Sequence, residues 1–94
     1  MPDIKIHSNG HATPHPLHVH NGETVNFTSD DGAWTVDFKD NRSPLPKLSY
    51  SGAKGASDGG EVKGTKGEKY SYTSGCTPDG DTKHSVDPDI IIDA

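Results

Sequence analysis

The chain has 94 residues, of which 28% are hydrophobic, and a formal net charge of −5. This length predicts a single domain, 1–94, and the negative charge repels phosphate backbones, which argues against nucleic-acid binding. No apolar run approaches the roughly 20 residues of a membrane helix, so we expect no membrane insertion. No apolar signal segment follows Met1, which predicts a cytoplasmic protein, or a periplasmic one if Met1 was added to a mature form.

Short runs of alternating apolar and polar residues predict strands in the first half of the chain. Large apolar residues recur there at a spacing of two, for example at Trp34, Val36 and Phe38. The predicted strands are 3–7, 17–20, 24–28 and 33–38. Turn sequences rich in glycine, proline and asparagine separate these runs.

The second half of the chain begins with a Gly/Pro-rich segment at about 39–60, where a long exposed loop is predicted. A short helical turn near 45–50 is the only element expected within it. Strands follow at 61–64, 69–73 and 89–92, with a polar turn over 77–83. About seven short strands with Gly/Pro punctuation predict an all-β fold, a single antiparallel β-sandwich. The aromatic residues expected in its core are Trp34, Phe38, Tyr70 and Tyr72.

Four segments together suggest a family. Residues 19–28, VHNGETVNFT, form a glycine turn that leads into an alternating strand, and residues 34–38 read WTVDF. The last two predicted strands lie in residues 69–73, KYSYT, and 87–93, DPDIIID. In their order and spacing these segments resemble the cupredoxins, where the second segment commonly reads His-Thr-Val-x-Phe. The resemblance implies one cupredoxin-like Greek-key domain over residues 1–94.

The resemblance also implies where copper ligands would stand. Blue-copper sites use two histidines, one cysteine and a weak axial methionine. If Cys76 matches the family cysteine, Asp79 replaces the second histidine and His84 takes the axial position. In a second register, Ser74 holds the cysteine position and Cys76 lies inside the following loop. Trp34 stands where the first histidine is expected, and an indole offers no lone pair to a metal.

Histidines supply a different candidate site. Five of the six lie between positions 7 and 20; they are His7, His11, His15, His18 and His20. Imidazoles at i and i+2 on a strand point to one face, so His18 and His20 are the main predicted ligands and the other three are local helpers. Cys76 and His84 form a further candidate pair. Copper is the expected metal, ahead of zinc or nickel; the alternative is that the histidines are solvated and bind no metal specifically.

The environment expected for Cys76 is a loop, because small polar residues surround it, and partial exposure follows. No adjacent base with an orienting partner and no paired general acid and base are apparent, so no enzyme is predicted. The sequence predicts a small protein that carries, buffers or senses a metal ion. The alternative is a copper-free cupredoxin-like module with a structural role or another protein as its partner.

Overall fold

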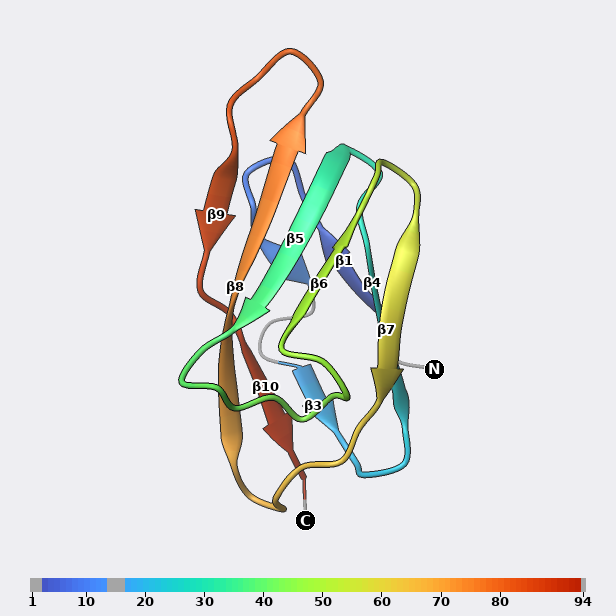
Figure 1. The fold of residues 1–94 in the computed structure, drawn as a ribbon, viewed down its shortest axis with the longest axis vertical. Helices are drawn as coiled ribbons and strands as arrows, with labels where there is room; N and C mark the ends of the chain where they lie inside the picture. Colours follow the sequence, from blue (N-terminus) through green and yellow to red (C-terminus); the bar gives the residue numbers. More distant parts are fainter. Residues whose placement is uncertain (1–2, 14–16, 94) are drawn as a thin grey trace.

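The computed structural model describes residues 3–13 and 17–93, and every regular element within these ranges is a β-strand. The strands are β1 (Asp3–Ile6), β2 (Ala12–Thr13), β3 (Leu17–Val19), β4 (Thr24–Thr28), β5 (Gly32–Phe38), β6 (Ser49–Gly52), β7 (Ser57–Glu61), β8 (Lys69–Pro78), β9 (His84–Val86) and β10 (Asp89–Ile92) (Figure 1). The all-β prediction is confirmed.

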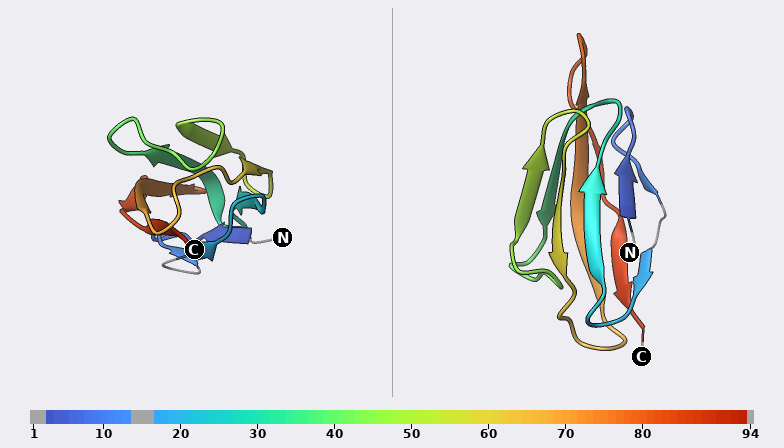
Figure 2. Two further views of the ribbon diagram at one scale, coloured as in Figure 1. Left: turned by 90° about the horizontal axis from the view of Figure 1, so that it is seen from below. Right: turned by 90° about the vertical axis from the view of Figure 1, so that its right-hand side faces the viewer.

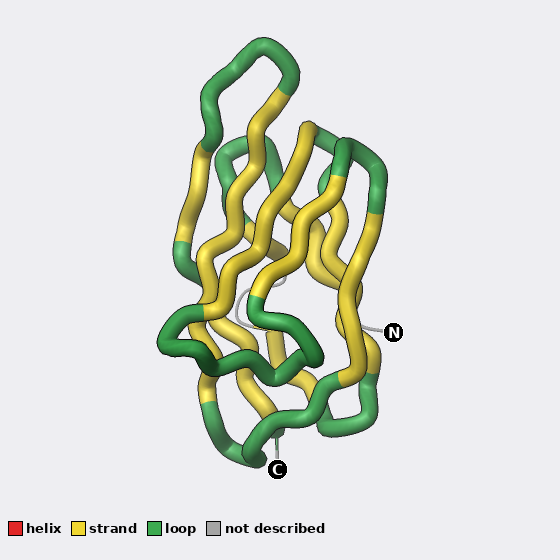
Figure 3. The backbone as a smooth tube through the Cα atoms, in the orientation of Figure 1, coloured by secondary structure: helices red, strands yellow, loops and turns green. Residues whose placement is uncertain are grey.

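The strands form two sheets. One has the order β2-β1-β4-β7, and the other has the order β3-β10-β8-β5-β6, with β9 also pairing with β8. Loops gather mainly at the two ends of the strands (Figure 3). Seen along the long axis, the strands surround a common interior (Figure 2).

The expectation of purely antiparallel pairing is wrong. β1 pairs with β4 in parallel, and β3 pairs with β10 in parallel. The cause is a crossover, because the chain leaves the first sheet after β2, contributes β3 to the second sheet and returns as β4 beside β1. Parallel neighbours require such a connection, whereas a hairpin would make them antiparallel.

The prediction of an exposed loop at about 39–60 is also wrong, because this segment contains β6 and most of β7. The helical turn expected near 45–50 is absent from this described segment. These strands, SYSG and SDGGE, lack apolar alternation and are held by backbone pairing to β5 and β4. Gly59 shows why glycine is needed, because an added Cβ would overlap with the Val25 carbonyl oxygen. The strand expected at 61–64 corresponds only to the end of β7, at Glu61.

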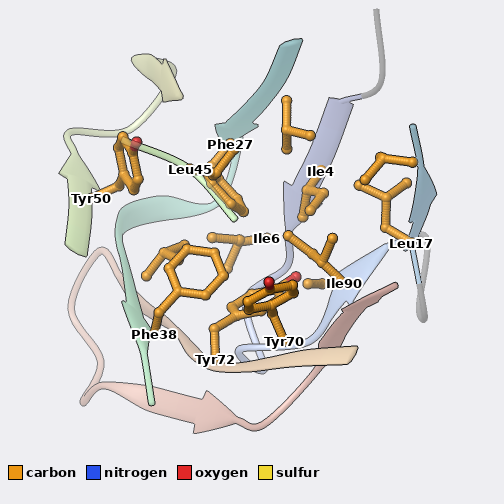
Figure 4. Close-up of a cluster of buried hydrophobic side chains, with 14 of the residues drawn as sticks. Ile4, Ile6, Leu17, Phe27, Phe38, Leu45, Tyr50, Tyr70, Tyr72 and Ile90 are labelled. Atoms are coloured by element: carbon orange, nitrogen blue, oxygen red, sulfur yellow. The ribbon is translucent and has the colours of Figure 1, made fainter. Parts of the chain in front are cut away.

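The core consists of apolar side chains from both sheets (Figure 4). Phe27 lies at its centre, with its ring centroid 5.9 Å from that of Tyr72 and 6.2 Å from that of Trp34. The four aromatic residues predicted for the core are all buried. Interior packing thus explains the alternation that marked the first strands.

Candidate functional site

Cys76 lies inside the protein and not in an exposed loop. It belongs to β8, and its side chain is 0% exposed, which corrects both expectations for this residue. The alternation of β8 continues past its aromatic residues through small ones, so Ser74 and Cys76 face the core while Thr73 and Thr77 do not. The small polar residues beside Cys76 in the sequence therefore led to the wrong prediction of a partly exposed loop.

Trp34 occupies the space beside this thiol. The β5–β8 register places Trp34 directly opposite Cys76, and the β5–β6 register places Gly52 on its other side. An added Cβ on Gly52 would lie 2.6 Å from the indole Nε1, so glycine makes room for the ring. The indole N–H donates a hydrogen bond to the Ala56 carbonyl at 3.0 Å, and Trp34 is 1% exposed. The space opposite Cys76 is therefore filled by the packed and hydrogen-bonded indole of Trp34.

The polar neighbour of the thiol is Ser29. Its Oγ lies 3.6 Å from Cys76 Sγ, and either atom can be the donor. The Asp31 backbone N–H donates to the same Oγ at 3.2 Å, and Ser29 is fully buried. A hydroxyl, rather than an imidazole, therefore contacts the sulfur.

Ser74, the residue of the second register, has a structural contact. Its buried hydroxyl donates a 2.6 Å hydrogen bond to the Gly10 carbonyl in the turn between β1 and β2. Gly10 has φ +88°, and an added Cβ there would lie 2.5 Å from the His84 carbonyl oxygen. This turn, which carries His7 and His11 at its ends, is thus packed against the β8–β9 hairpin.

His84 is brought next to Cys76 along the backbone. The two residues are direct partners in the β8–β9 register. Their surroundings differ, because the imidazole is exposed and its Nε2 lies 3.3 Å from Asp81 Oδ2. The Thr82 N–H and then His84 hold the pKa of the Asp81 carboxyl below its usual value. Asp79 is exposed and pairs with Lys54 at 3.5 Å.

The predicted histidines separate into two groups at opposite ends of the strands (Figures 1 and 2). His7 and His11 flank the β1–β2 turn, where His7 Nε2 lies 2.7 Å from Thr13 Oγ1. His18 is in β3 and His20 follows it, near the C-terminal end of β10. His15 lies outside the described residues.

His18 contacts a carboxylate that follows β10. Its Nδ1 lies 3.0 Å from Asp93 Oδ1, which leaves Nε2 available to a ligand. A carboxylate on one ring nitrogen is a common way to orient a metal-binding histidine. Yet among residues 3–13 and 17–93 no three His, Cys, Asp or Glu side chains are grouped so that they could hold a metal ion.

Two of these neighbours were missed by the sequence reasoning. Asp93 lies 75 positions from His18, and Ser29 lies 47 positions from Cys76. Both contacts depend on which strands become neighbours. The only available signal was the position of each residue just after a predicted strand.

Comparisons with known proteins add no family to this geometry. The chain matches no model of a known protein family, no curated protein sequence and no solved structure. Across the described part of the chain, no helix is long and apolar enough to span a membrane. The class of protein has to be inferred from the two sheets and from the side chains around Cys76.

Proposed function

We propose that the chain is a copper-free module of the cupredoxin type, a Greek-key β-sandwich that acts as a structural or protein-interaction domain without catalytic activity. The observation that carries this proposal is the buried Trp34 indole directly opposite Cys76. Support for the fold comes from two sheets that contribute to one core and from the crossover that joins them.

The chemistry around Cys76 favours a packing role over a metal centre. Copper sites of this type join a thiolate to two imidazoles, whereas Cys76 is flanked by an indole and contacts the Ser29 hydroxyl. A buried cysteine with such neighbours behaves as a small apolar residue. Copper would therefore have to displace a side chain that is fully packed.

The titrating groups are consistent with a non-catalytic module. Asp30, Asp81 and Asp87 are exposed carboxyls with lowered pKa values, each hydrogen-bonded to a neighbouring side chain or backbone group. A general acid instead needs a raised pKa, usually in a desolvated site. These shifts are typical of surface ion pairs and turns.

Copper titration of the full chain tests the proposal. We expect Cu(II) to produce no thiolate-to-copper absorption band, and the spectra of wild type and Cys76→Ser to be the same. The Trp34→Phe variant, which keeps an aromatic ring, should behave in the same way. An intense band in the wild type that disappears in Cys76→Ser would overturn the copper-free reading.

A second candidate function is carriage, buffering or sensing of copper through surface histidines, with zinc or nickel as weaker ligands. The specific observation in its favour is that His18, which lies two residues before His20, contacts the Asp93 carboxylate. Calorimetric titration should then show one stoichiometric site that is lost in His18→Ala/His20→Ala and weakened in Asp93→Asn. His7→Ala/His11→Ala is the matched control, and equal binding by both double variants would exclude this site.

A further inference from the structure

A polar hollow lies on the outer face of the six-stranded sheet, over β5 and β6. Its volume is about 250 Å³. Thr35 and Asp37 of β5 line it, together with Ser49 and Ser51 of β6. These residues alternate with Trp34 and Val36, which face the core, so the hollow is on the opposite side of the sheet from the Cys76 site.

The strand register arranges the four polar side chains as two facing pairs. Thr35 is opposite Ser51, and Asp37 is opposite Ser49. Opposed side chains on neighbouring strands stand about 4.5–5.5 Å apart at Cβ. The floor of the hollow is therefore a compact set of three hydroxyls and one carboxylate held by backbone pairing.

A positive group stands at the wall of this hollow. Lys47 Nζ lies 3.4 Å from Asp58 Oδ2 and 4.6 Å from the centroid of the Tyr50 ring. The Lys47 backbone N–H also donates to the Tyr50 hydroxyl at 3.3 Å. These contacts hold the ammonium group near the floor as a hydrogen-bond donor.

The floor has unused hydrogen-bonding capacity. Within the described residues, the side chains of Thr35, Asp37, Ser49 and Ser51 make no hydrogen bond or ion pair with another protein group. A hydroxyl can both donate and accept, whereas an ionised carboxylate only accepts. A matching ligand must therefore present several donors and acceptors within the width of two strands.

We propose that this hollow binds a polyhydroxylated ring, that is, a saccharide unit. Vicinal hydroxyls of such a ring would donate to Asp37, exchange hydrogen bonds with the serine and threonine hydroxyls, and accept from Lys47. The site is separate from Cys76 and from both histidine groups, so it stands whether or not the protein binds a metal.

Other ligand classes fit this hollow less well. Anions would be repelled by Asp37 and Asp58, which line the hollow, and by the net charge of −5. Apolar ligands find little surface, since Tyr50 is only 3% exposed. Hard cations such as Ca²⁺ require 6–8 oxygen ligands, but Asp58 is already paired with Lys47.

The volume of the hollow limits the size of the ligand and the affinity with which it can bind. It is smaller than the roughly 300–1,000 Å³ of drug-sized pockets, so one ring fits better than a long chain. Binding that buries little apolar surface and displaces water from polar groups is weak, with a Kd on the order of 1 mM or above.

Two-dimensional amide NMR of the full chain tests this proposal. Glucose, galactose, mannose and their disaccharides are titrated at concentrations above about 10 mM, as weak binding requires. At least one sugar should produce saturable shifts centred on the amides of residues 35, 37, 49 and 51. Asp37→Asn should lower the affinity for that sugar by about tenfold, because hydrogen bonds to the charged Asp37 carboxylate are stronger than those to the neighbouring hydroxyls.

The matched control is Asp40→Asn, which removes the same charge from the exposed loop after β5. Its backbone has φ 59°, a region that asparagine also accepts. Asp40→Asn should bind like the wild type, and Ser49→Ala/Ser51→Ala should bind more weakly. The proposal is overturned if no sugar gives saturable shifts in the hollow, if Asp37→Asn binds as well as Asp40→Asn, or if acyclic sorbitol or Ca²⁺ gives the same response as the sugars.

Discussion

Trp34 joins three strands through one side chain. The indole packs near Phe27, lies between Gly52 and Cys76 and donates to the Ala56 carbonyl. Truncation in Trp34→Ala should lower the free energy of unfolding by about 3–5 kcal/mol, as for other buried aromatic residues. Urea denaturation measures this loss, and Trp34→Phe should lose clearly less. An unchanged midpoint in Trp34→Ala would contradict the packing described here.

Tyr72 raises a different question, because its hydroxyl is buried and has no hydrogen-bond partner among the described residues. Burial, and to a smaller extent Asp89, raises the pKa of Tyr72. Removing an unpaired buried hydroxyl can be neutral or stabilising. We expect Tyr72→Phe to leave stability unchanged or raise it by up to about 1 kcal/mol.

Tyr70 provides the matched comparison for this prediction. Its hydroxyl accepts a hydrogen bond from the Thr65 N–H at 3.0 Å, so Tyr70→Phe should be destabilised by about 1 kcal/mol. Thermal unfolding of the two variants side by side separates the cases. A larger loss in Tyr72→Phe than in Tyr70→Phe would show that the Tyr72 hydroxyl has a partner.

At the scale of elements, β7 depends on the absence of a side chain at Gly59. The Val25 carbonyl occupies the space where a Cβ would lie, and backbone atoms cannot move aside as a flexible side chain can. Gly59→Ala should therefore detach β7 from β4 and destabilise the protein by about 1–3 kcal/mol. Ser57→Ala, at an exposed position of the same strand, is the control.

Amide hydrogen exchange locates the effect of Gly59→Ala. Exchange should accelerate first in β7 and in β4, which pairs with it along its whole length, while β5 and β8 stay protected. Equal protection of β7 in Gly59→Ala and Ser57→Ala would show that the close approach to Val25 can be relieved at little cost.

The elements also show how far the sequence could be interpreted. Strands β1, β4 and β5 were predictable because their buried apolar residues alternate. β6 and β7 were not, since serine and glycine predominate and pairing with β5 and β4 replaces side-chain packing as the main support. β8 was predicted only to residue 73, because beyond Tyr72 its inward positions are the small residues Ser74 and Cys76.

The candidate site was predictable to a similar degree. The resemblance matched Trp34 and, in one of two registers, Cys76 to copper-ligand positions, but the sequence did not predict that the two residues would lie opposite each other on neighbouring strands, as the register shows. The burial of Cys76 was not predictable, because its neighbours Trp34 and Ser29 are distant in the sequence and are brought to it by the pairing of β5 with β8 and by the fold. The separation of the histidines into two groups depends on the crossover between the sheets, which local patterns do not encode.

On the scale of the whole molecule, exposed ion pairs connect segments far apart in the chain. They join Lys5 to Asp30, Lys39 to Asp87, Arg42 to Glu68, Lys47 to Asp58 and Lys54 to Asp79. Each exposed pair contributes little by itself and is weakened by salt. Their common effect is that part of the negative surface charge is neutralised by neighbouring cations.

Acid should weaken this network in a defined direction. The pKa of Asp87 is lowered by the Thr73 hydroxyl and then Lys39, and that of Asp30 is lowered by Lys5. A carboxyl with a lower pKa in the folded state binds fewer protons there than in the unfolded chain. The stability that such a carboxyl contributes is therefore fully present at a pH above its pKa in the unfolded chain, which is about 4. This stability is lost as the pH falls through the pKa of the carboxyl in the folded protein.

Thermal midpoints measured between pH 7 and pH 2 at low salt test this direction. The midpoint should change little between pH 7 and pH 5 on account of these carboxyls and should fall below about pH 4. Asp87→Asn should be less stable than the wild type at pH 7 and approach it at pH 2, because both then lack the charge. High salt should reduce the part of this difference that comes from Lys39, while the hydrogen bond from Thr73 persists. A difference that stays constant from pH 7 to pH 2 would mean that the carboxylate charge of Asp87 does not contribute to stability.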